Sequence, residues 1–191
     1  MAYISLYRKY RPKKFSDVVG QDVVVKILRN SIIENKIGHA YIFAGPRGIG
    51  KTSIAKIFSK AVNCLNSIDG DLCGKCESCI NDINNEIDIV EIDAASNNGV
   101  EEIREIRNNI KLMPTKLKYK VYIIDEVHML SISAFNALLK TLEEPPAHAI
   151  FILATTEINK IPNTVISRCQ KFDFEKIPPE LIEKLHTEKR K

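Results

Sequence analysis

The sequence predicts an α/β fold in which a parallel five-stranded sheet is flanked by helices. Short apolar segments rich in β-forming residues alternate with segments whose apolar residues recur every three or four positions, as on a buried helix face. This alternation is typical of parallel strands connected by helices that cover both faces of the sheet. The predicted strands span residues 40–44, 87–92, 121–124, 150–154 and 170–174.

Helices are predicted between these strands. Residues 54–62 and 133–142 carry the helical spacing, and the polar turn at 96–99 precedes a helix that begins near Val100. Pro145 and Pro146 end the helix of 133–142, because proline lacks the N–H that a continuing helix requires. These elements suffice for one hydrophobic core.

Composition and charge place the chain among ordinary soluble globular proteins. Of its 191 residues, 45% are hydrophobic and 27% are charged, which is enough chain to bury a core without disulfides. The net charge of +4 permits an anionic partner but does not require one. We find neither a signal peptide nor a membrane-spanning run, so we expect a cytoplasmic protein with no membrane partner.

A glycine-rich segment after the first predicted strand matches the phosphate-binding P-loop pattern GxxxxGK[ST] in full. Its glycines let backbone N–H groups surround phosphates, while Lys51 reaches the β- and γ-phosphates and the Thr52 hydroxyl binds Mg²⁺. The flanking strand and helix argue against a chance glycine-rich turn. The predicted nucleotide-binding residues are Gly45, Pro46, Arg47, Gly48, Ile49, Gly50, Lys51, Thr52 and Ser53.

Two carboxylates follow the third predicted strand. We expect Asp125 to bind the Mg²⁺ and Glu126 to act as general base toward the attacking water, which indicates hydrolysis. Such an acidic pair is more often a solvated turn or helix cap, but a P-loop upstream favours the catalytic interpretation. The segment NKIP at 159–162 resembles the guanine-reading NKxD pattern, yet Pro162 replaces its aspartate, so ATP is predicted rather than GTP.

Four cysteines form a C-x8-C-x2-C-x2-C pattern and are the predicted ligands of a structural Zn²⁺ ion. They are Cys64, Cys73, Cys76 and Cys79. An iron–sulfur cluster is a minor alternative, because the x3-C-P continuation of ferredoxins is absent. The fifth cysteine, Cys169, is expected to be a buried bystander.

Longer segments resemble the AAA+ ATPases of clamp loaders, in particular the gamma/tau family of bacterial DNA polymerase III. They are GPRGIGKTS, YIIDEVHMLS, FNALLKTLEEPP, LATTE and SRC, together with YRKYRPKKFSDVVGQ, DAASNNGV and the cysteine module, and they cover nearly the whole chain. The resemblance implies a P-loop NTPase domain of the AAA+ type over residues 1–177, with a zinc-binding module inserted at about 64–79. Residues 178–191 are then the expected start of a helical lid domain, cut short.

The resemblance also assigns individual residues. Thr156 matches the sensor 1 position, although Thr155 is one residue away, and Arg168 matches an arginine finger that reaches the ATP of a neighbouring subunit. On its own, Arg168 would more simply form a surface salt bridge. The segment with Arg11, Val18 and Val19 is implied to contact base and ribose, but its basic residues and tyrosines equally suit nucleic acid.

Contact with DNA is expected through the DNA backbone. By resemblance, Lys140 lies on a helix that faces DNA, where a lysine–phosphate contact is independent of base sequence. The loop residues Asn97, Asn98 and Gly99 are neutral, whereas some relatives carry basic residues there. His128 is expected to serve packing or loop geometry rather than catalysis.

The function implied by the resemblance is that of an ATP-hydrolysing clamp-loader subunit of DNA polymerase III, which opens the sliding clamp and loads it onto primed DNA. The implied partners are gamma/tau copies, the delta and delta prime subunits, the clamp and the DNA. A nucleotide-binding scaffold subunit with little turnover is the alternative, whereas a metabolite kinase leaves Arg168 and the zinc module unexplained. Because no polymerase carboxylate constellation is visible, any nucleotidyltransferase activity would belong to the holoenzyme.

Overall fold

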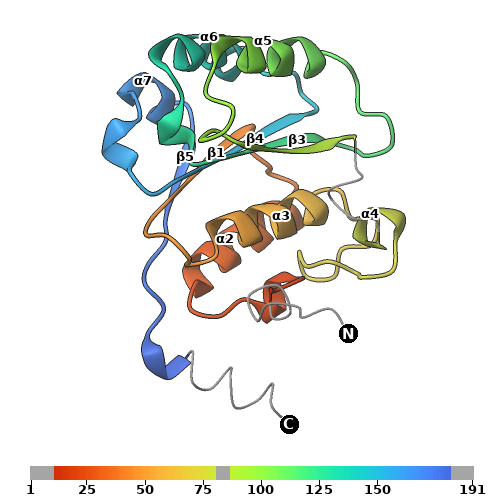
Figure 1. The fold of residues 1–191 in the computed structure, drawn as a ribbon. Helices are drawn as coiled ribbons and strands as arrows, with labels where there is room; N and C mark the ends of the chain where they lie inside the picture. Colours follow the sequence, from red (N-terminus) through yellow and green to blue (C-terminus); the bar gives the residue numbers. More distant parts are fainter. Residues whose placement is uncertain (1–10, 81–86, 182–191) are drawn as a thin grey trace, which may run out of the picture.

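The computed structural model describes residues 11–80 and 87–181, which form a parallel five-stranded sheet between two helical layers (Figure 1). The strands are β1 (Ala40–Ala44), β2 (Ile89–Asp93), β3 (Lys120–Asp125), β4 (Ala149–Thr155) and β5 (Gln170–Asp173). Their order is β2-β3-β4-β1-β5, and each neighbouring pair is parallel. All the predicted strands are confirmed, although β2 begins at Ile89 rather than at residue 87, because residues 87 and 88 form a turn.

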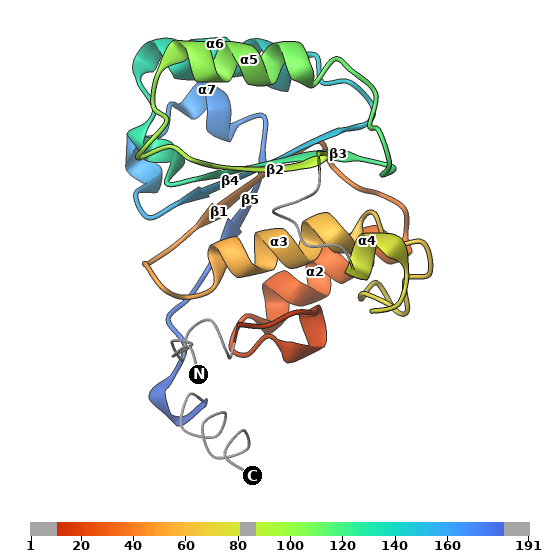
Figure 2. The ribbon, with the colours of Figure 1, turned by 45° about the vertical axis from the view of Figure 1, so that its right-hand side comes forward.

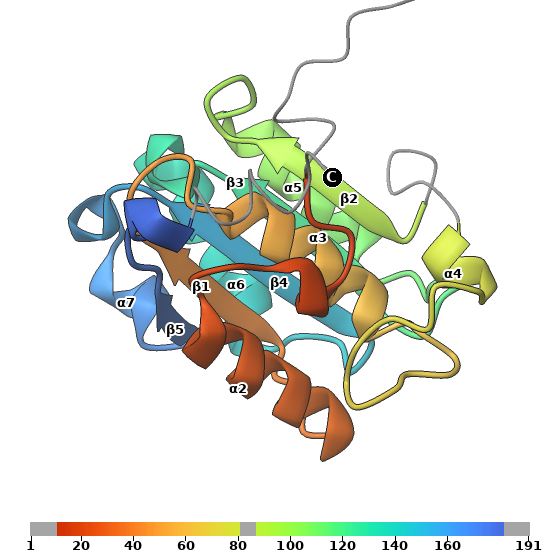
Figure 3. The same ribbon diagram turned by 90° about the horizontal axis from the view of Figure 1, so that it is seen from below.

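Helices cover both faces of the sheet. Helices α2 (Asp22–Ile33) and α3 (Lys51–Ala61) lie side by side on one face, with α4 (Glu77–Ile80) next to α3 (Figures 2 and 3). The opposite face carries α5 (Val100–Asn109), α6 (Ile132–Glu143) and α7 (Asn163–Ile166). Short 3₁₀ helices occur in the loops at η1 (Phe15–Asp17), η3 (Val127–Met129) and η4 (Ile158–Lys160).

The alternation of side chains along the strands divides the core between the two faces. Ile42 and Leu153 pack toward the α5 and α6 layer, whereas Tyr41 and Phe43 pack toward the α2 and α3 layer. The rings of Tyr41 and Phe58 meet edge to face, with centroids 5.0 Å apart. Every residue of β1 and β4 is buried, as expected for central strands of a sheet covered on both faces.

Helix α2 is an element that the sequence pattern did not predict. Three valines, a residue type that favours strands, follow its first residue, Asp22. Within the helix, Val24 and Leu28 are buried, one turn apart, whereas Val23 is 72% exposed. The buried stripe is therefore narrow, and packing against η1 and α3 rather than intrinsic propensity explains the helix.

Two expectations fall partly outside the described residues. Of the basic N-terminal run, only residues 11–14 are described, and of the expected lid segment only residues 178–181. Among the described residues, no helix combines the length and apolar character needed to cross a membrane.

The turn that leads into β2 is held by a buried carboxylate. Both oxygens of Asp88 accept backbone N–H bonds, from Thr115, Lys116 and Leu117, at distances of 2.8 to 3.1 Å. Burial alone would raise the pKa of Asp88, but these N–H donors and the nearby Lys120 ammonium outweigh it and hold the pKa below its ordinary value. Asp88 thereby fixes the loop before β3 to the sheet.

We expect Asp88→Asn to lower the free energy of unfolding by about 2–3 kcal/mol at pH 7, because an amide cannot satisfy these donors as the carboxylate does. Urea denaturation of both proteins measures the difference. The stabilisation is complete above the ordinary pKa of 3.8 and is lost as pH falls through the lowered folded pKa. The difference between the two proteins should therefore shrink in acid, and a constant difference would contradict this explanation.

Candidate functional site

The P-loop connects β1 to α3 and has the backbone geometry that phosphate binding requires. Gly48 and Gly50 have φ angles of 81° and 99°, in the left-handed region that favours glycine. Gly45 lies so close to the segment after β5 that a Cβ there would be 2.5 Å from the Phe174 carbonyl oxygen. Because α3 begins at Lys51, the unpaired N–H groups of its first turn are available to an anion at the loop.

The Lys51 ammonium is held by the loop itself. Its Nζ donates hydrogen bonds to the carbonyl oxygens of Gly45 at 2.8 Å and Pro46 at 2.7 Å. Burial lowers the pKa of Lys51, and the carboxylates of Glu126 and Asp125 partly oppose this shift. A mostly buried cation that has two neutral acceptors among the described residues is well suited to an additional anionic partner.

A hydroxyl and a carboxylate from two different elements meet beside the P-loop. The Thr52 Oγ1, on α3, donates to the Asp125 Oδ2, at the end of β3, over 2.7 Å. The second oxygen of Asp125 accepts the backbone N–H of Glu126 at 2.9 Å. Hydroxyl and carboxylate oxygens are the ligands that Mg²⁺ prefers, so the predicted pair of Thr52 and Asp125 fits that ion chemically.

The structure distinguishes between the two threonines at the end of β4. Thr156 Oγ1 donates to the Glu126 Oε2 over 3.0 Å. Thr155 is fully buried, and its Oγ1 instead accepts the N–H of Glu157 and lies 3.1 Å from the His128 Nδ1. Of the two, therefore, Thr156 is the one that contacts the predicted general base.

Glu126 has an unusual backbone and a polar neighbour that the sequence analysis did not connect with it. Its φ is 48°, in the left-handed region that non-glycine residues rarely adopt. His128, whose side chain is mostly buried, has its Nδ1 3.4 Å from the Glu126 Oε2 and its Nε2 3.4 Å from a Glu157 oxygen. The spacing E-x-H alone does not reveal this contact, because it depends on the turn at η3.

A cleft of about 660 Å³ brings the P-loop and the acidic pair together with the N-terminal segment. Its lining includes the predicted residues Arg11, Val18 and Val19, and the Arg11 Nε donates to the Ser53 Oγ at 3.0 Å. Residues that line it but were not predicted are Pro12, Asp17, Ile54, Asp93 and Ile177. The signal for Asp93 was its position at the end of β2, in register with Asp125.

Arg168 lies outside this cleft. It follows α7, and its Nη2 forms a salt bridge with the Glu143 carboxylate at 2.8 Å while its Nη1 donates to the Thr164 carbonyl oxygen at 2.6 Å. About a third of the side chain is exposed. The structure therefore contains the surface salt bridge that was the simpler alternative for Arg168, and it leaves this guanidinium apart from the chain's own P-loop.

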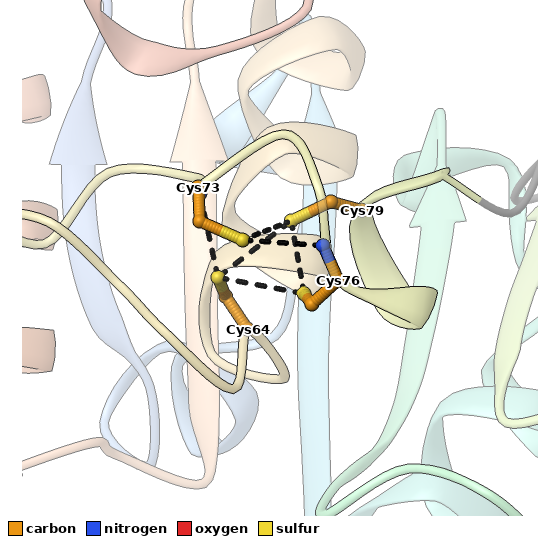
Figure 4. Close-up of side chains that lie close together, drawn as sticks. All are labelled: Cys64, Cys73, Cys76 and Cys79. Atoms are coloured by element: carbon orange, nitrogen blue, oxygen red, sulfur yellow. Dashed lines mark hydrogen bonds between the residues drawn. The ribbon is translucent and has the colours of Figure 1, made fainter.

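The four predicted zinc ligands converge on one point (Figure 4). The Sγ–Sγ distances are 3.8 Å for Cys64–Cys76 and Cys73–Cys79, 3.6 Å for Cys64–Cys79 and 3.4 Å for Cys76–Cys79. All four sulfurs lie within 4.8 Å of one another. A tetrahedral Zn²⁺ with Zn–S bonds of about 2.3 Å requires sulfurs about 3.8 Å apart, so the cluster fits zinc.

Backbone N–H groups donate hydrogen bonds to sulfurs of the cluster, an arrangement that favours thiolates. The N–H groups of Lys75 and Cys76 donate to the Cys73 Sγ at 3.5 and 3.3 Å and lower the pKa of that thiol. Cys169 lies elsewhere, packed against the α6 side of the core, where burial raises the pKa of its thiol to about 12. Only the four clustered cysteines among the described residues therefore offer a closed metal site.

Comparisons of the sequence with known proteins agree with the motifs. A family model described as "DNA polymerase III, delta subunit" matches residues 20–178. The DNA polymerase III subunit tau of Bacillus subtilis is 61% identical over 183 residues, which is 95% of this chain and 32% of that relative. The DNA polymerase III subunit gamma/tau of Mycoplasma pneumoniae is 56% identical, over 93% of this chain and 26% of that relative. The chain thus spans less than a third of either relative.

Solved structures have the same fold. A DNA polymerase III gamma subunit-related protein of Thermotoga maritima has a TM-score of 0.62 at 23% identity, over 86% of this chain and 48% of that one. The RuvB Holliday junction branch migration motor of the same organism has a TM-score of 0.64 at 19% identity, over 92% and 52%. At such identities the likeness shows the fold alone, and it agrees with the predicted parallel five-stranded sheet flanked by helices.

The predicted resemblance to gamma/tau subunits is confirmed by these relatives, and the family model covers most of the chain. The chain therefore belongs to the DNA polymerase III, delta subunit family.

Proposed function

We propose that this chain binds ATP with Mg²⁺ in the cleft and hydrolyses it as a subunit of a DNA polymerase III clamp loader. The observation that carries the proposal is the meeting of three strand ends around the P-loop. The Thr52–Asp125 contact of 2.7 Å and the Thr156–Glu126 contact of 3.0 Å join these ends. The names of the relatives supply the replication context.

Each residue of the cleft has a distinct role in this proposal. Lys51 would exchange its loop carbonyl contacts for the β- and γ-phosphates, and Thr52 and Asp125 would hold the Mg²⁺, which would neutralise charge on the phosphates. Glu126 accepts the proton of the attacking water, and Thr156 orients that carboxylate. Together these residues would bind the phosphates and the Mg²⁺ and deprotonate the attacking water, which suits hydrolysis.

The base and ribose lie against the N-terminal segment in this proposal. Arg11, Val18 and Val19 line the cleft beyond the P-loop, together with Ile177 from the segment after β5. Apolar side chains next to a basic one suit a flat heteroaromatic base with a sugar. This favours the nucleotide interpretation of Arg11 over the nucleic-acid interpretation.

Arg168 acts in trans in this proposal. Its guanidinium is partly exposed and does not line the chain's own cleft, so a phosphate that it contacts belongs to a neighbouring subunit. Its salt bridge with Glu143 then holds the side chain in place until assembly. A finger of this kind makes hydrolysis depend on assembly.

The proposed assembly contains gamma/tau copies with delta and delta prime subunits, and it acts on the sliding clamp and primed DNA in the cytoplasm. Lys140, in the last turn of α6, is the proposed contact with the DNA backbone. In this scheme residues 1–177 form the nucleotide-binding domain, and residues 178–191 begin the helical lid.

We also propose that the four clustered cysteines hold a structural Zn²⁺. The sulfur separations and the N–H donors to Cys73 support this ion over unligated thiols. Four protein ligands leave no open position for substrate, so the ion stabilises the loop between α3 and β2 rather than taking part in hydrolysis.

We expect Glu126→Gln to lower the rate of ATP hydrolysis by about 10² or more and to leave Mg-ATP affinity within a few fold, because the amide cannot accept the proton. Steady-state phosphate release and calorimetric titration measure the two quantities. Glu101→Gln, on the exposed surface of α5, is the control and should hydrolyse like the wild type. Equally low rates in wild type and Glu126→Gln, with ATP bound by both, would instead support a nucleotide-binding scaffold, whereas equally high rates would contradict the role of Glu126 as general base.

For Arg168→Ala, we expect hydrolysis by the assembled loader with clamp and primed DNA to fall by about 10³ or more, while ATP binding persists. Loss of the exposed salt bridge should cost about 1 kcal/mol of stability at most. The matched control is Arg104→Ala, which also removes a surface ion pair, with Glu101. A hydrolysis rate that changes neither with DNA and clamp nor with Arg168→Ala would refute the clamp-loader assignment but not the P-loop assignment.

For the zinc site, we expect purified protein to contain one Zn²⁺ per chain and Cys73→Ser to lose it, because three thiolates bind zinc far less tightly than four. Native mass spectrometry measures the metal content directly. Cys169→Ser is the control, since Cys169 lies outside the cluster, and it should retain the ion. Iron in place of zinc, or zinc retained by Cys73→Ser, would contradict the proposed site.

A further inference from the structure

One carboxylate joins the cysteine cluster to the wall of the nucleotide cleft. Asp71 lies in the loop between Cys64 and Cys73, and only 8% of it is exposed. Its Oδ1 accepts the backbone N–H of Phe15 at 2.9 Å, and its Oδ2 accepts that of Ser16, also at 2.9 Å. Asp71 therefore fixes η1 to a loop more than fifty residues later in the chain.

The loop that carries Asp71 is itself tightly held. Ile68 and Asp71 pair through two backbone hydrogen bonds, of 2.8 and 3.1 Å. Gly70 has a φ of 73° and packs so closely on α2 that a Cβ would lie 2.5 Å from the Arg29 carbonyl oxygen. The Arg29 Nε also donates to the Asp69 carbonyl oxygen at 2.8 Å. The position of Asp71 thus depends on this turn, which ends two residues before Cys73.

The segment that Asp71 holds forms one wall of the nucleotide cleft. Phe15 is buried in the core, which anchors the start of η1. The residues on both sides of this anchor, Arg11 before it and Val18 and Val19 after it, line the cleft. A shift of η1 therefore displaces the wall on both sides.

We propose that the metal-loaded cysteine cluster supports the base side of the nucleotide cleft through Asp71, so that zinc and nucleotide binding are positively coupled. The inference rests on the proposed nucleotide and zinc sites and adds a positioning role for Asp71. Zinc closes the loop between Cys64 and Cys73 and thereby fixes Asp71. Without the ion, the nucleotide has to order the wall itself and binds more weakly. By linkage, nucleotide raises the affinity for zinc by the same factor.

The test measures the dissociation constant of Mg-ADP by calorimetry for zinc-loaded and zinc-stripped protein. We expect zinc removal to weaken wild-type binding about tenfold. Zinc-loaded Asp71→Asn should keep its ion, by native mass spectrometry, yet bind Mg-ADP about tenfold more weakly than wild type. Removal of zinc from this variant should then have little further effect, because the connection is already lost.

Asp88→Asn is the matched control for this experiment. Asp88 is also a buried carboxylate that accepts several backbone N–H bonds, but it holds the loop before β3 and lines no part of the cleft. The Asp88→Asn variant should be less stable than the wild type but bind Mg-ADP with the same affinity. Zinc removal should weaken its Mg-ADP binding as much as it does in the wild type. Normal Mg-ADP affinity in zinc-loaded Asp71→Asn would overturn the proposal, and this comparison does not require zinc-stripped protein.

Other outcomes identify which step is wrong. An equal loss of affinity on zinc removal in wild type and in Asp71→Asn would overturn the role of Asp71. Zinc-loaded wild type that binds no Mg-ADP would overturn the proposed nucleotide site together with the coupling. Wild type that binds Mg-ADP but holds no zinc would overturn the metal site while leaving the nucleotide proposal intact.

Discussion

The parallel pairing of β4 between β1 and β3 is the constraint on which the candidate site depends. Ala44 pairs with Thr155, and Ile124 pairs with Leu153, so the three strands end at nearly the same level. The P-loop, the acidic pair and the Thr156 loop therefore leave the sheet at one edge. A one-residue slip of β4 would turn its side chains to the opposite faces and remove Thr156 from Glu126.

Structural features that depend on residues close together in the sequence could be predicted, whereas features that depend on tertiary contacts could not. The strands and the P-loop depend on patterns within about ten residues, and the spacing of the cysteines specified a cluster that the structure brings together. The choice between Thr155 and Thr156, by contrast, depends on which hydroxyl faces β3. The position of Asp71 under η1 carries no local signal, because its partners lie more than fifty residues away.

Backbone strain in the cleft coincides with the proposed chemistry. The left-handed backbone of Glu126 costs about 1–3 kcal/mol, so the surrounding contacts have to maintain it. Its carbonyl accepts the N–H of Met129 at 2.9 Å, and its side chain lies between Thr156 and His128. These neighbours fix the carboxylate beside the P-loop before any ligand arrives. His128 thus lies against the carboxylate of the proposed general base.

The base side of the cleft is built from opposite ends of the described chain. Gln21 Nε2 donates to the Glu175 carbonyl oxygen at 2.7 Å, and Gly20 lies against Ile177, with which a Cβ would be in contact at 3.0 Å. The segment before α2 is therefore bonded to two places: to the residues that follow β5, and through Asp71 to the loop between Cys64 and Cys73. A nucleotide held against this segment would stabilise both attachments at once. Residue 178, where the proposed lid begins, follows directly after Ile177. The contact of Ile177 with the cleft would therefore couple nucleotide binding to the position of the proposed lid.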